Sequence, residues 1–440
     1  MGPGGAKSWW AARRKRAAAR ILDLFARPVR NAHGAEGIVL QPYRGYGSRT
    51  EAFLIGRVFR QSASHGASGR EDLAAHLRDI ARRIARRAVR GAEVTARCHG
   101  AEQRVVTDRD GYFRIHLKFP EPPPAARPWL TVDLRLEGAH PVEAEVDVFI
   151  APERSRFVVI SDIDDTVMRT GVANKLAMLW RLFVEDAEDR SPFPGVAALY
   201  RALHDGVSER ECNPMLYVSR APWGIYDVLD EFFRLHRIPI GPILFLREWG
   251  LRWTSPLPRR AEDHKQILIR NMLDLYHDLP FVLIGDSGQH DPEIYRQIVD
   301  EHPGRVLAVL IRNVSRGEDR VREIEGLAAA VASAGSTLVL AADSVAMAEH
   351  ASRLGLVPPS SVAAVEADMA AAGAQEARPG TLRVERPTAA GTAEAIAQGA
   401  LRGALREAIR GRPESAPPNV VVQPRDAPRR DARKGGRAAP

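Results

Sequence analysis

The segment from Phe157 to Thr166 constrains the fold of this 440-residue chain more than any other. Its first four residues are apolar, and the acidic residues Asp162, Asp164 and Asp165 follow closely. A short apolar run of this kind predicts a buried strand of a parallel sheet. Open α/β sheets bind ligands beyond the carboxyl ends of their strands, and crowded carboxylates repel one another unless a cation lies among them. Taken alone, Asp164-Asp165-Thr166 is equally typical of a helix cap or a turn.

The composition is that of a soluble globular protein. Hydrophobic residues make up 45% and charged residues 27% of the chain, and its length is sufficient for more than one domain. The two cysteines, Cys98 and Cys212, provide no disulfide framework. No uninterrupted apolar stretch approaches the roughly 18 to 20 residues that span a bilayer. The net charge of +8 favours acidic partners such as phosphates, nucleic acid or an anionic membrane.

Residues 1–35 form a strongly basic arm in which aromatic and aliphatic residues are interleaved. A helix here would gather Trp10, Ile21 and Phe25 on one side, which suits the surface of an anionic membrane. A solvated basic arm whose helix packs on its own protein explains the same pattern equally well. The apolar run is too short for a convincing signal peptide.

Residues 36–151 are interpreted as a mainly β domain, a small β-sandwich with one helix inserted at Asp72–Arg90. Alternating apolar and polar residues are typical of half-buried strands. Asp108-Arg109-Asp110-Gly111 predicts a hairpin turn, and Tyr43–Gly47 is interpreted as a structural loop because no helix follows it directly. The predicted strands are Ala52–Arg60, Ala92–Cys98, Tyr112–Leu117, Leu130–Leu136 and Val142–Phe149.

Residues 152–357 alternate short apolar runs with helical patterns, for example the helices Gly224–Arg237 and His264–Tyr276. This alternation predicts an α/β domain built on a doubly wound parallel sheet. Residues 358–440 are rich in Ala, Arg, Pro and Gly and are predicted to be a low-complexity, disordered tail. The predicted strands of the sheet are Phe157–Ile163, Pro214–Ser219, Pro242–Leu246, Phe281–Ile284, Val306–Ile311 and Thr337–Ala341.

Polar residues gather in four segments of the predicted α/β domain, each at the end of an apolar strand or the start of a helix. The segments are Asp162–Thr166, Ser219, His264-Lys265 and Gly285–Asp291. Each is a weak signal alone, but their combination in this order indicates one site at one edge of the sheet.

These segments resemble the four motifs of the haloacid dehalogenase superfamily of phosphatases, with Asp162, Asp164 and Thr166 as its aspartate-X-aspartate-X-threonine signature. Residues 152 to about 355 are similar, more narrowly, to the App1-type phosphatidate phosphatase catalytic domain, which is related to the lipin catalytic region. The resemblance implies a haloacid-dehalogenase-like sheet without a large cap. It rests on Ser161–Thr166, Tyr217–Ser219, Pro222-Trp223, Tyr226, Leu246–Gly250 and Gly285–Tyr295.

The resemblance also implies catalytic roles. Asp162 is the expected nucleophile, which forms an aspartyl-phosphate, and Asp164 is the expected general acid and base, with Thr166 completing the signature. Ser219 is expected to hydrogen-bond a phosphoryl oxygen. Lys265 is expected to neutralise charge shared by Asp162 and the phosphoryl group, in competition with Arg247, Arg252, Arg259 and Arg260.

A magnesium ion is the implied cofactor, since Mg²⁺ prefers oxygen ligands and keeps several of its waters. The carboxylates of Asp162 and Asp286 and the backbone carbonyl of Asp164 are the expected ligands. Asp291 is expected to bind the metal or to orient its waters. The sequence does not discriminate Mg²⁺ from Mn²⁺.

The implied reaction is hydrolysis of phosphatidate to diacylglycerol and phosphate by a cytoplasmic enzyme that works at the inner face of an anionic membrane, with no specific nucleic acid as partner. The apolar segment Leu176–Phe183 and the basic arm fit such a surface, although packing of Leu176–Phe183 on its own domain fits as well. A phosphatase acting on a protein, nucleotide or small metabolite and a non-catalytic phospholipid-binding module remain alternatives. Arg220, in place of the small or amide residue usual in the family, leaves the identity of the substrate open.

Overall fold

The computed structural model describes residues 37–60, 87–124, 128–164, 166–167, 192–220, 223, 226–245, 261–315 and 317–376. The basic arm of residues 1–35, the segment Leu176–Phe183 and the chain beyond residue 376 lie outside these residues, as does most of the helix predicted at Asp72–Arg90. Among the described residues, no helix is both long enough and apolar enough to cross a membrane.

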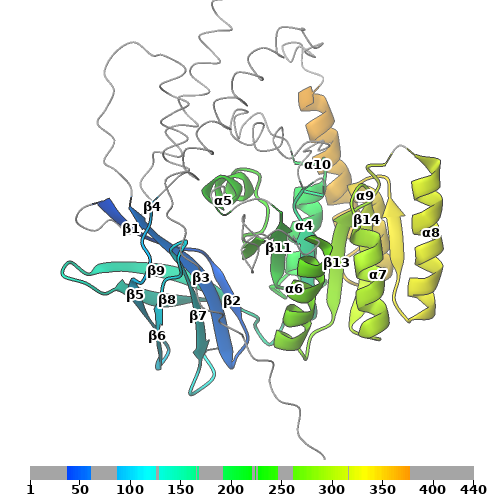
Figure 1. The fold of residues 1–440 in the computed structure, drawn as a ribbon. Helices are drawn as coiled ribbons and strands as arrows, with labels where there is room; N and C mark the ends of the chain where they lie inside the picture. The colour runs from blue at the N-terminus through cyan, green and yellow to red at the C-terminus, as the bar shows by residue number, and fades with distance from the viewer. Residues whose placement is uncertain are drawn as a thin grey trace, which may run out of the picture.

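The first part of the described chain is a mixed, mostly antiparallel sheet with nine strands (Figure 1). The strand order is β1-β3-β2-β9-β8-β5-β6, with β4 and β7 also paired to β3. Of these pairs only β2 and β9 run parallel within the described residues. The strands are β1 Ile38–Pro42, β2 Gly45–Gly47, β3 Glu51–Arg60, β4 Arg87–Ala88, β5 Glu93–Cys98, β6 Ala101–Val106, β7 Tyr112–Lys118, β8 Trp129–Leu136 and β9 Val142–Ile150.

Burial alternates along most of these strands, as the period of two in their sequences predicts. In β9, for example, Val142, Ala144, Val146 and Val148 are buried and the residues between them are exposed. The inward residues form one apolar core, which includes Leu54, Val94, Ile115 and Val132. All five strands predicted in this part of the chain are confirmed to within a residue or two.

Three details of this sheet differ from the sequence predictions. The turn at Asp108–Gly111 forms, with the amide of Gly111 donating to the carbonyl of Asp108 at 3.0 Å, but the predicted hairpin is wrong because β6 pairs with β5 and β7 with β3. The end of the helix predicted at Asp72–Arg90 is also wrong, since Arg87–Ala88 is strand β4. The segment Tyr43–Gly47, taken as a loop, contains strand β2.

The second part of the described chain is an α/β domain around an all-parallel sheet of six strands in the order β12-β11-β10-β13-β14-β15. All six were predicted. The strands are β10 Val158–Asp162, β11 Met215–Ser219, β12 Ile243–Phe245, β13 Phe281–Asp286, β14 Val306–Arg312 and β15 Leu338–Ala341. The helices are α4 Val196–Asp205, α5 Tyr226–Leu235, α6 Ala261–Leu275, α7 Asp291–Glu301, α8 Glu318–Ser333, α9 Ser344–Arg353 and α10 Ser360–Glu376.

Helices cover both faces of this sheet, so its central strands are apolar on both sides (Figure 1). Alternate residues of a strand face opposite layers: Val159 of β10 packs with α4, α5, α9 and α10, whereas Val158 and Ile160 pack with α6, α7 and α8. This two-sided burial explains why the strands appear in the sequence as continuous apolar runs.

The α/β domain extends past the boundary predicted at residue 357. Helix α10, which falls in the predicted tail, buries Val365 in the core shared with α4 and α9. Gly195, at the start of α4, provides the close approach, since a Cβ there would lie 2.9 Å from Val365 Cγ1. The alanine-rich sequence that indicated low complexity also has high helix propensity. Packing of Val365 in the core then stabilises this helix.

The two parts of the described chain share an interface at α5. The ring of Tyr43 lies 4.2 Å from Trp223 and 4.8 Å from Tyr226, measured between ring centroids. Arg44 pairs with Asp230, and its backbone amide donates to the Tyr226 hydroxyl at 3.1 Å. The β sheet therefore supports the helix that follows β11.

Candidate active site

The order of the parallel sheet places a crevice between β10 and β13. The chain adds strands outward on one side, β10-β11-β12, and then returns to add β13-β14-β15 on the other. Ligands of open α/β sheets bind at the carboxyl ends of the strands at such a reversal point. Asp162 ends β10 and Asp286 ends β13, so the predicted acidic residues lie at this position.

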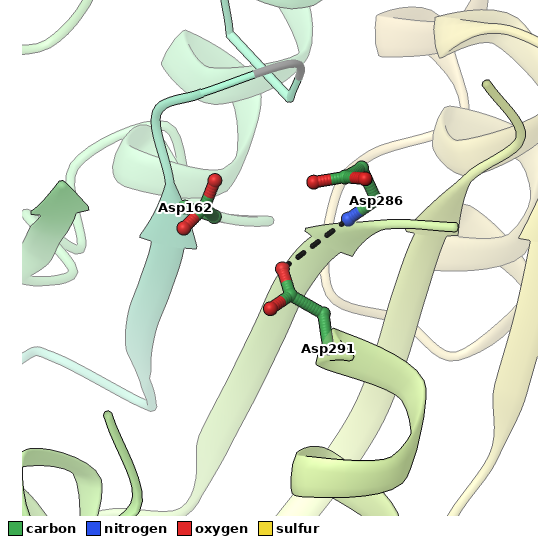
Figure 2. Close-up of side chains that lie close together, drawn as sticks. All are labelled: Asp162, Asp286 and Asp291. Atoms are coloured by element: carbon green, nitrogen blue, oxygen red, sulfur yellow. Dashed lines mark hydrogen bonds between the residues drawn. The ribbon is translucent and has the colours of Figure 1, made fainter. Parts of the chain in front are cut away.

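Three carboxylates meet there, as Figure 2 shows. Asp162, Asp286 and Asp291 are fully buried, and each offers an oxygen within 4.8 Å of the others. Asp286 is held by its own loop: its Oδ1 accepts from the amides of Gly288 at 2.7 Å and Gln289 at 3.0 Å, and its Oδ2 accepts from Gln289 Nε2 at 2.9 Å. Asp162 Oδ2, in contrast, has no hydrogen-bond partner in the described part of the chain.

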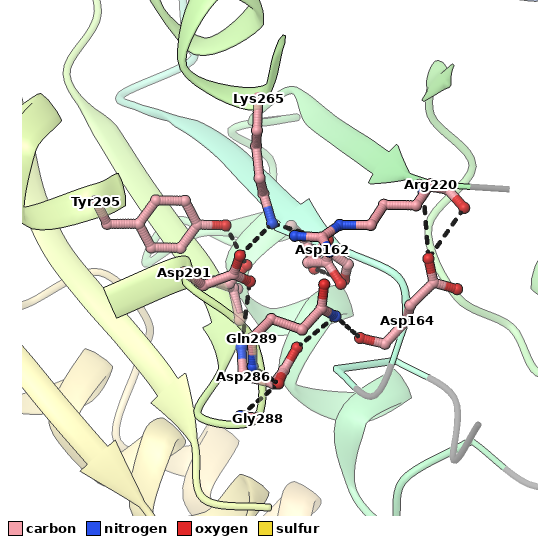
Figure 3. A network of polar contacts seen from close by, with 12 residues as sticks. Asp162, Asp164, Arg220, Lys265, Asp286, Gly288, Gln289, Asp291 and Tyr295 are labelled. Carbon is pink, nitrogen blue, oxygen red and sulfur yellow. Dashed lines mark hydrogen bonds and ion pairs between the residues drawn. The ribbon is translucent and has the colours of Figure 1, made fainter. Parts of the chain in front are cut away.

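Lys265 bridges two of these carboxylates from α6. Its Nζ donates to Asp162 Oδ1 at 2.8 Å and to Asp291 Oδ1 at 2.6 Å, and the side chain is fully buried. Burial alone lowers the pKa of Lys265, but Asp162 and Asp291 raise it well above its ordinary value. The side chain is therefore an ammonium group, which forms ion pairs with these two carboxylates (Figure 3).

The surroundings of Asp162 shift the pKa of its carboxyl group in opposite directions. Burial raises its pKa well above the ordinary value for aspartate, Lys265 lowers it, and Asp291, Asp164 and Asp286 raise it again. A single ammonium thus faces several buried carboxylates, which is an unfavourable balance without a further cation. The group has the hard oxygen donors that Mg²⁺ prefers, and the unpartnered Asp162 Oδ2 is an available ligand atom.

Asp164 is close by but faces a different direction. Its Oδ2 accepts from Ser219 Oγ at 3.4 Å and from the backbone amide of Arg220 at 3.3 Å, at the end of β11. Its carbonyl oxygen accepts from Gln289 Nε2 at 3.2 Å. Its carboxylate is not one of the three that form the buried acidic group.

Asp291 depends on a glycine for its position. A Cβ at Gly285 would lie 2.3 Å from Asp291 Oδ2 and 2.7 Å from Asp291 Cβ. Asp291 Oδ2 accepts from the backbone amide of Asp286 at 3.4 Å, the contact drawn in Figure 2. Gly285 is therefore required here because of space, not because of an unusual backbone angle.

Thr166 is fully buried just after β10, and its Oγ1 has no hydrogen-bond partner within the described residues. Its carbonyl oxygen accepts from Arg312 Nε at 3.2 Å. Arg312, at the end of β14, is 4% exposed and also donates to Ser344 Oγ at 2.9 Å. The buried guanidinium of Arg312, at the end of β14, thus holds the turn that follows β10 and carries the acidic residues.

Comparison with known proteins identifies the domain that carries this site. Residues 157–313 match the family model described as the catalytic domain of phosphatidate phosphatase APP1. This domain belongs to the APP1 catalytic-domain family. The matched residues include the five strands β10 to β14, and with them the residues of the acidic site.

Two curated proteins resemble the chain over part of its length. Phosphatidate phosphatase APP1 of Saccharomyces cerevisiae is 32% identical over 187 residues, which are 42% of this chain and 30% of that protein. An uncharacterised protein of Schizosaccharomyces pombe is 26% identical over 221 residues, which are 49% of this chain and 35% of that protein. The similarity thus spans about a third of the length of these relatives.

Among solved structures, a carbohydrate acetylesterase from Xanthomonas citri aligns with 65% of this chain and 71% of its own, at 10% identity and a TM-score of 0.23. A xyloglucanase from Bacteroides ovatus aligns at 6% identity and a TM-score of 0.16, over 68% of this chain and 62% of its own. Similarity at this level carries no information about the fold or chemistry of the APP1-type domain.

The structure brings Asp162, Asp286, Asp291 and Lys265 together, with Asp164 and Ser219 beside them. Sequence reasoning gave no role to Gln289, Gly285 or Arg312. Gln289 and Gly285 lie inside a recognised motif, so their presence was visible, whereas Arg312 gave no signal of its own. Arg247, Arg252, Arg259 and Arg260, the competitors of Lys265, lie outside the described residues.

Proposed function

We propose that this protein is a Mg²⁺-dependent phosphatidate phosphatase that releases diacylglycerol and phosphate through an aspartyl-phosphate on Asp162. The observation that carries the proposal is the unpartnered, buried Oδ2 of Asp162 in a group of three carboxylates at the reversal point of the sheet. The family of the domain supports the substrate class, and the phosphatidate phosphatase of yeast is similar over this region. In fold terms, we propose a haloacid-dehalogenase-like domain without a large cap.

In the first step, an oxygen of Asp162 attacks the phosphorus, and the bond from phosphorus to the glycerol oxygen breaks. The leaving alkoxide takes a proton from Asp164, so that diacylglycerol leaves neutral. Ser219 Oγ and the Arg220 amide hold Asp164 at the end of β11, 3.4 and 3.3 Å from its Oδ2. This anchoring keeps the acid on the opposite side of the site from Lys265.

In the second step, Asp164 accepts a proton from water, the hydroxide oxygen bonds to phosphorus, and the acyl-phosphate bond to Asp162 breaks. Lys265 keeps Asp162 ionised as the leaving carboxylate, since it donates to Oδ1 at 2.8 Å. Phosphate is released and Asp164 is protonated again for the next turnover.

The residues present fit a divalent cation. Asp162, Asp286 and the carbonyl oxygen of Asp164 would hold it, and Asp291 would bind it or orient its waters. Such an ion screens the negative phosphate from the negative nucleophile. Asp286 is preorganised for this role because two amides and one side-chain amide already fix its oxygens.

The basic arm of residues 1–35 is proposed to bring the enzyme to an anionic membrane surface from the cytoplasm. Deletion of residues 1–30 is expected to weaken binding to anionic vesicles and to leave hydrolysis of a soluble aryl phosphate unchanged. Equal vesicle binding by the two forms would refute this part of the proposal.

The test of the proposed function is phosphate release from phosphatidate in mixed micelles, with and without Mg²⁺, beside a soluble aryl phosphate. We expect Mg²⁺-dependent release from phosphatidate, far above the aryl phosphate, and none from the Asp162→Asn variant. Release from the aryl phosphate alone would assign the site to a non-lipid phosphoester. If neither substrate and no other phosphoester is turned over, the domain is a phospholipid-binding module.

A further inference from the structure

Arg220 follows β11 directly and shares the acidic site. Its backbone amide donates to Asp164, and Figure 3 shows its side chain extending back across the strand ends toward the carboxylates. The roles already assigned to the site give this side chain no function.

The guanidinium of Arg220 has donors that the protein does not use. Nε and Nη2 are buried, and neither has a hydrogen-bond partner among the described residues. No ion pair joins Arg220 to a carboxylate in that part of the chain. A buried charged donor without a partner is costly, so the conformation is explained best by a ligand that accepts from these two atoms.

The two unused nitrogens define the shape of that ligand. Nε and Nη2 lie on one edge of the planar guanidinium, so their N–H bonds run nearly parallel. Two oxygens of one phosphate or carboxylate match this spacing, and arginine binds such groups through both at once. This edge of the guanidinium therefore has the donor geometry that an oxyanion requires.

The charge of the reacting phosphoryl group also favours a further cation in the site. Lys265 donates to Asp162 and to Asp291, so both of the hydrogen bonds that its ammonium group makes in the described residues go to these carboxylates. A phosphate monoester carries nearly two negative charges at pH 7, so a further positive group beside it is favourable. Arg220 extends toward the carboxylates, and its Nε and Nη2 have no hydrogen-bond partner among the described residues.

We propose that Arg220 binds two non-bridging oxygens of the reacting phosphoryl group through Nε and Nη2, an inference that rests on the proposed phosphatase function. In this position it stabilises charge on the phosphoryl group during transfer, the role that Lys265 cannot fill while it bridges Asp162 and Asp291. Because the contact is to the phosphoryl group, it is common to every substrate of the enzyme.

The test compares Arg220→Ala, Arg220→Lys and the surface control Arg296→Ala, whose side chain is 45% exposed and pairs with Asp300 on α7. Two quantities are measured: kcat/KM on phosphatidate and on a soluble aryl phosphate, and the affinity of the Mg²⁺-loaded protein for inorganic phosphate by calorimetry. We expect Arg220→Ala to lower kcat/KM on both substrates by about 10²-fold and phosphate affinity by about 10-fold. Arg220→Lys should recover part of each loss, and Arg296→Ala should behave as wild type.

A loss confined to phosphatidate, with aryl phosphate turnover and phosphate affinity unchanged, would overturn the proposal, since Arg220 would then contact the lipid and not the phosphoryl group. Wild-type behaviour of Arg220→Ala would overturn it as well. If Arg220→Ala fails to fold, Arg220→Gln replaces it. Absence of turnover in the wild type would remove the proposed function, while phosphate affinity would still decide the role of Arg220.

Discussion

Exposed ion pairs occur in both domains of this protein, whereas the fully buried pairs of the described residues lie in the α/β domain. In the β domain, carboxylates and guanidinium groups pair at the surface: Arg104 with Glu93 and Arg114 with Asp108, all with side chains 39 to 61% exposed. In the α/β domain, Asp162, Asp291 and Lys265 pair with no exposure at all. The same residue types thus occur in two different dielectric environments.

This difference separates structural from functional charge. Exposed ion pairs contribute about 0 to 1 kcal/mol and are screened by salt. Buried charges carry a desolvation penalty that frequently exceeds their mutual attraction, so the acidic group at β10 and β13 is poorly explained as a device for stability. The proposed phosphoryl transfer, which needs crowded carboxylates and a cation, would account for this cost.

The strongest test of this contrast is Asp162→Asn. The substitution removes one buried charge and nearly no volume, so the domain should fold, while phosphate release should fall by at least about 10³-fold because the nucleophile is lost. Circular dichroism and phosphate release measure the two effects. Asp147→Asn, on an exposed position of β9, is the matched control and should retain full turnover. Unchanged activity of Asp162→Asn would remove the assignment of the nucleophile.

A smaller effect is expected from Gly285→Ala, which neither adds nor removes a charge. The added Cβ would displace Asp291, since it would lie 2.3 Å from Asp291 Oδ2, and displacement of about 1 Å costs about 10²-fold in rate. Gly317→Ala is the control, because a Cβ there meets nothing within 4 Å. If the two variants have equal kcat/KM, the position of Asp291 does not matter for turnover.

Binding of a metal ion to the carboxylates of Asp162, Asp286 and Asp291 should stabilise the folded protein. Mg²⁺ at about 100 times its dissociation constant should stabilise the folded protein by about 2.7 kcal/mol, seen as a higher midpoint of thermal unfolding. Because burial raises the pKa of Asp162, protons compete with the ion, and the stabilisation should grow as the pH rises through that pKa. Asp286→Asn should lose the effect. Equal stabilisation of both proteins would mean that the ion binds elsewhere.

The smallest effect is expected when an exposed ion pair of the β domain is broken. Arg104→Ala breaks the pair with Glu93 and should change the free energy of unfolding by no more than about 1 kcal/mol. Chemical denaturation measures this change, and turnover should equal that of the wild type. A loss of several kcal/mol would show that surface pairs of the β domain carry more stability than their exposure implies.

The sequence predicted the parallel sheet well because its central strands are buried on both faces. The apolar runs of β10, β11 and β13 therefore stood out, and the polar residues that follow them marked the site. The strand order did not follow from the sequence, since it depends on which apolar runs pair. The reversal between β10 and β13 was visible only in the structure.

Elements stabilised by tertiary contacts were missed. Strand β2, Gly45–Gly47, has no strand propensity of its own, and a Cβ at Gly45 would lie 2.3 Å from the carbonyl oxygen of Phe53. Strand β6 exposes Val106, so its pattern is weak. Within the site, the bridge from Lys265 to Asp291 and the direction of Arg220 depend on side-chain geometry that spacing in sequence does not encode.

The measurement that tests the central claim most directly is the trapping of a covalent intermediate. The Mg²⁺-loaded protein is mixed with phosphatidate, quenched during turnover and reduced with borohydride, which converts an aspartyl-phosphate to homoserine, and its peptides are analysed by mass spectrometry. The account predicts homoserine at position 162 and none in the Asp162→Asn variant. Turnover without modification of Asp162, or modification of a different carboxylate, would contradict it.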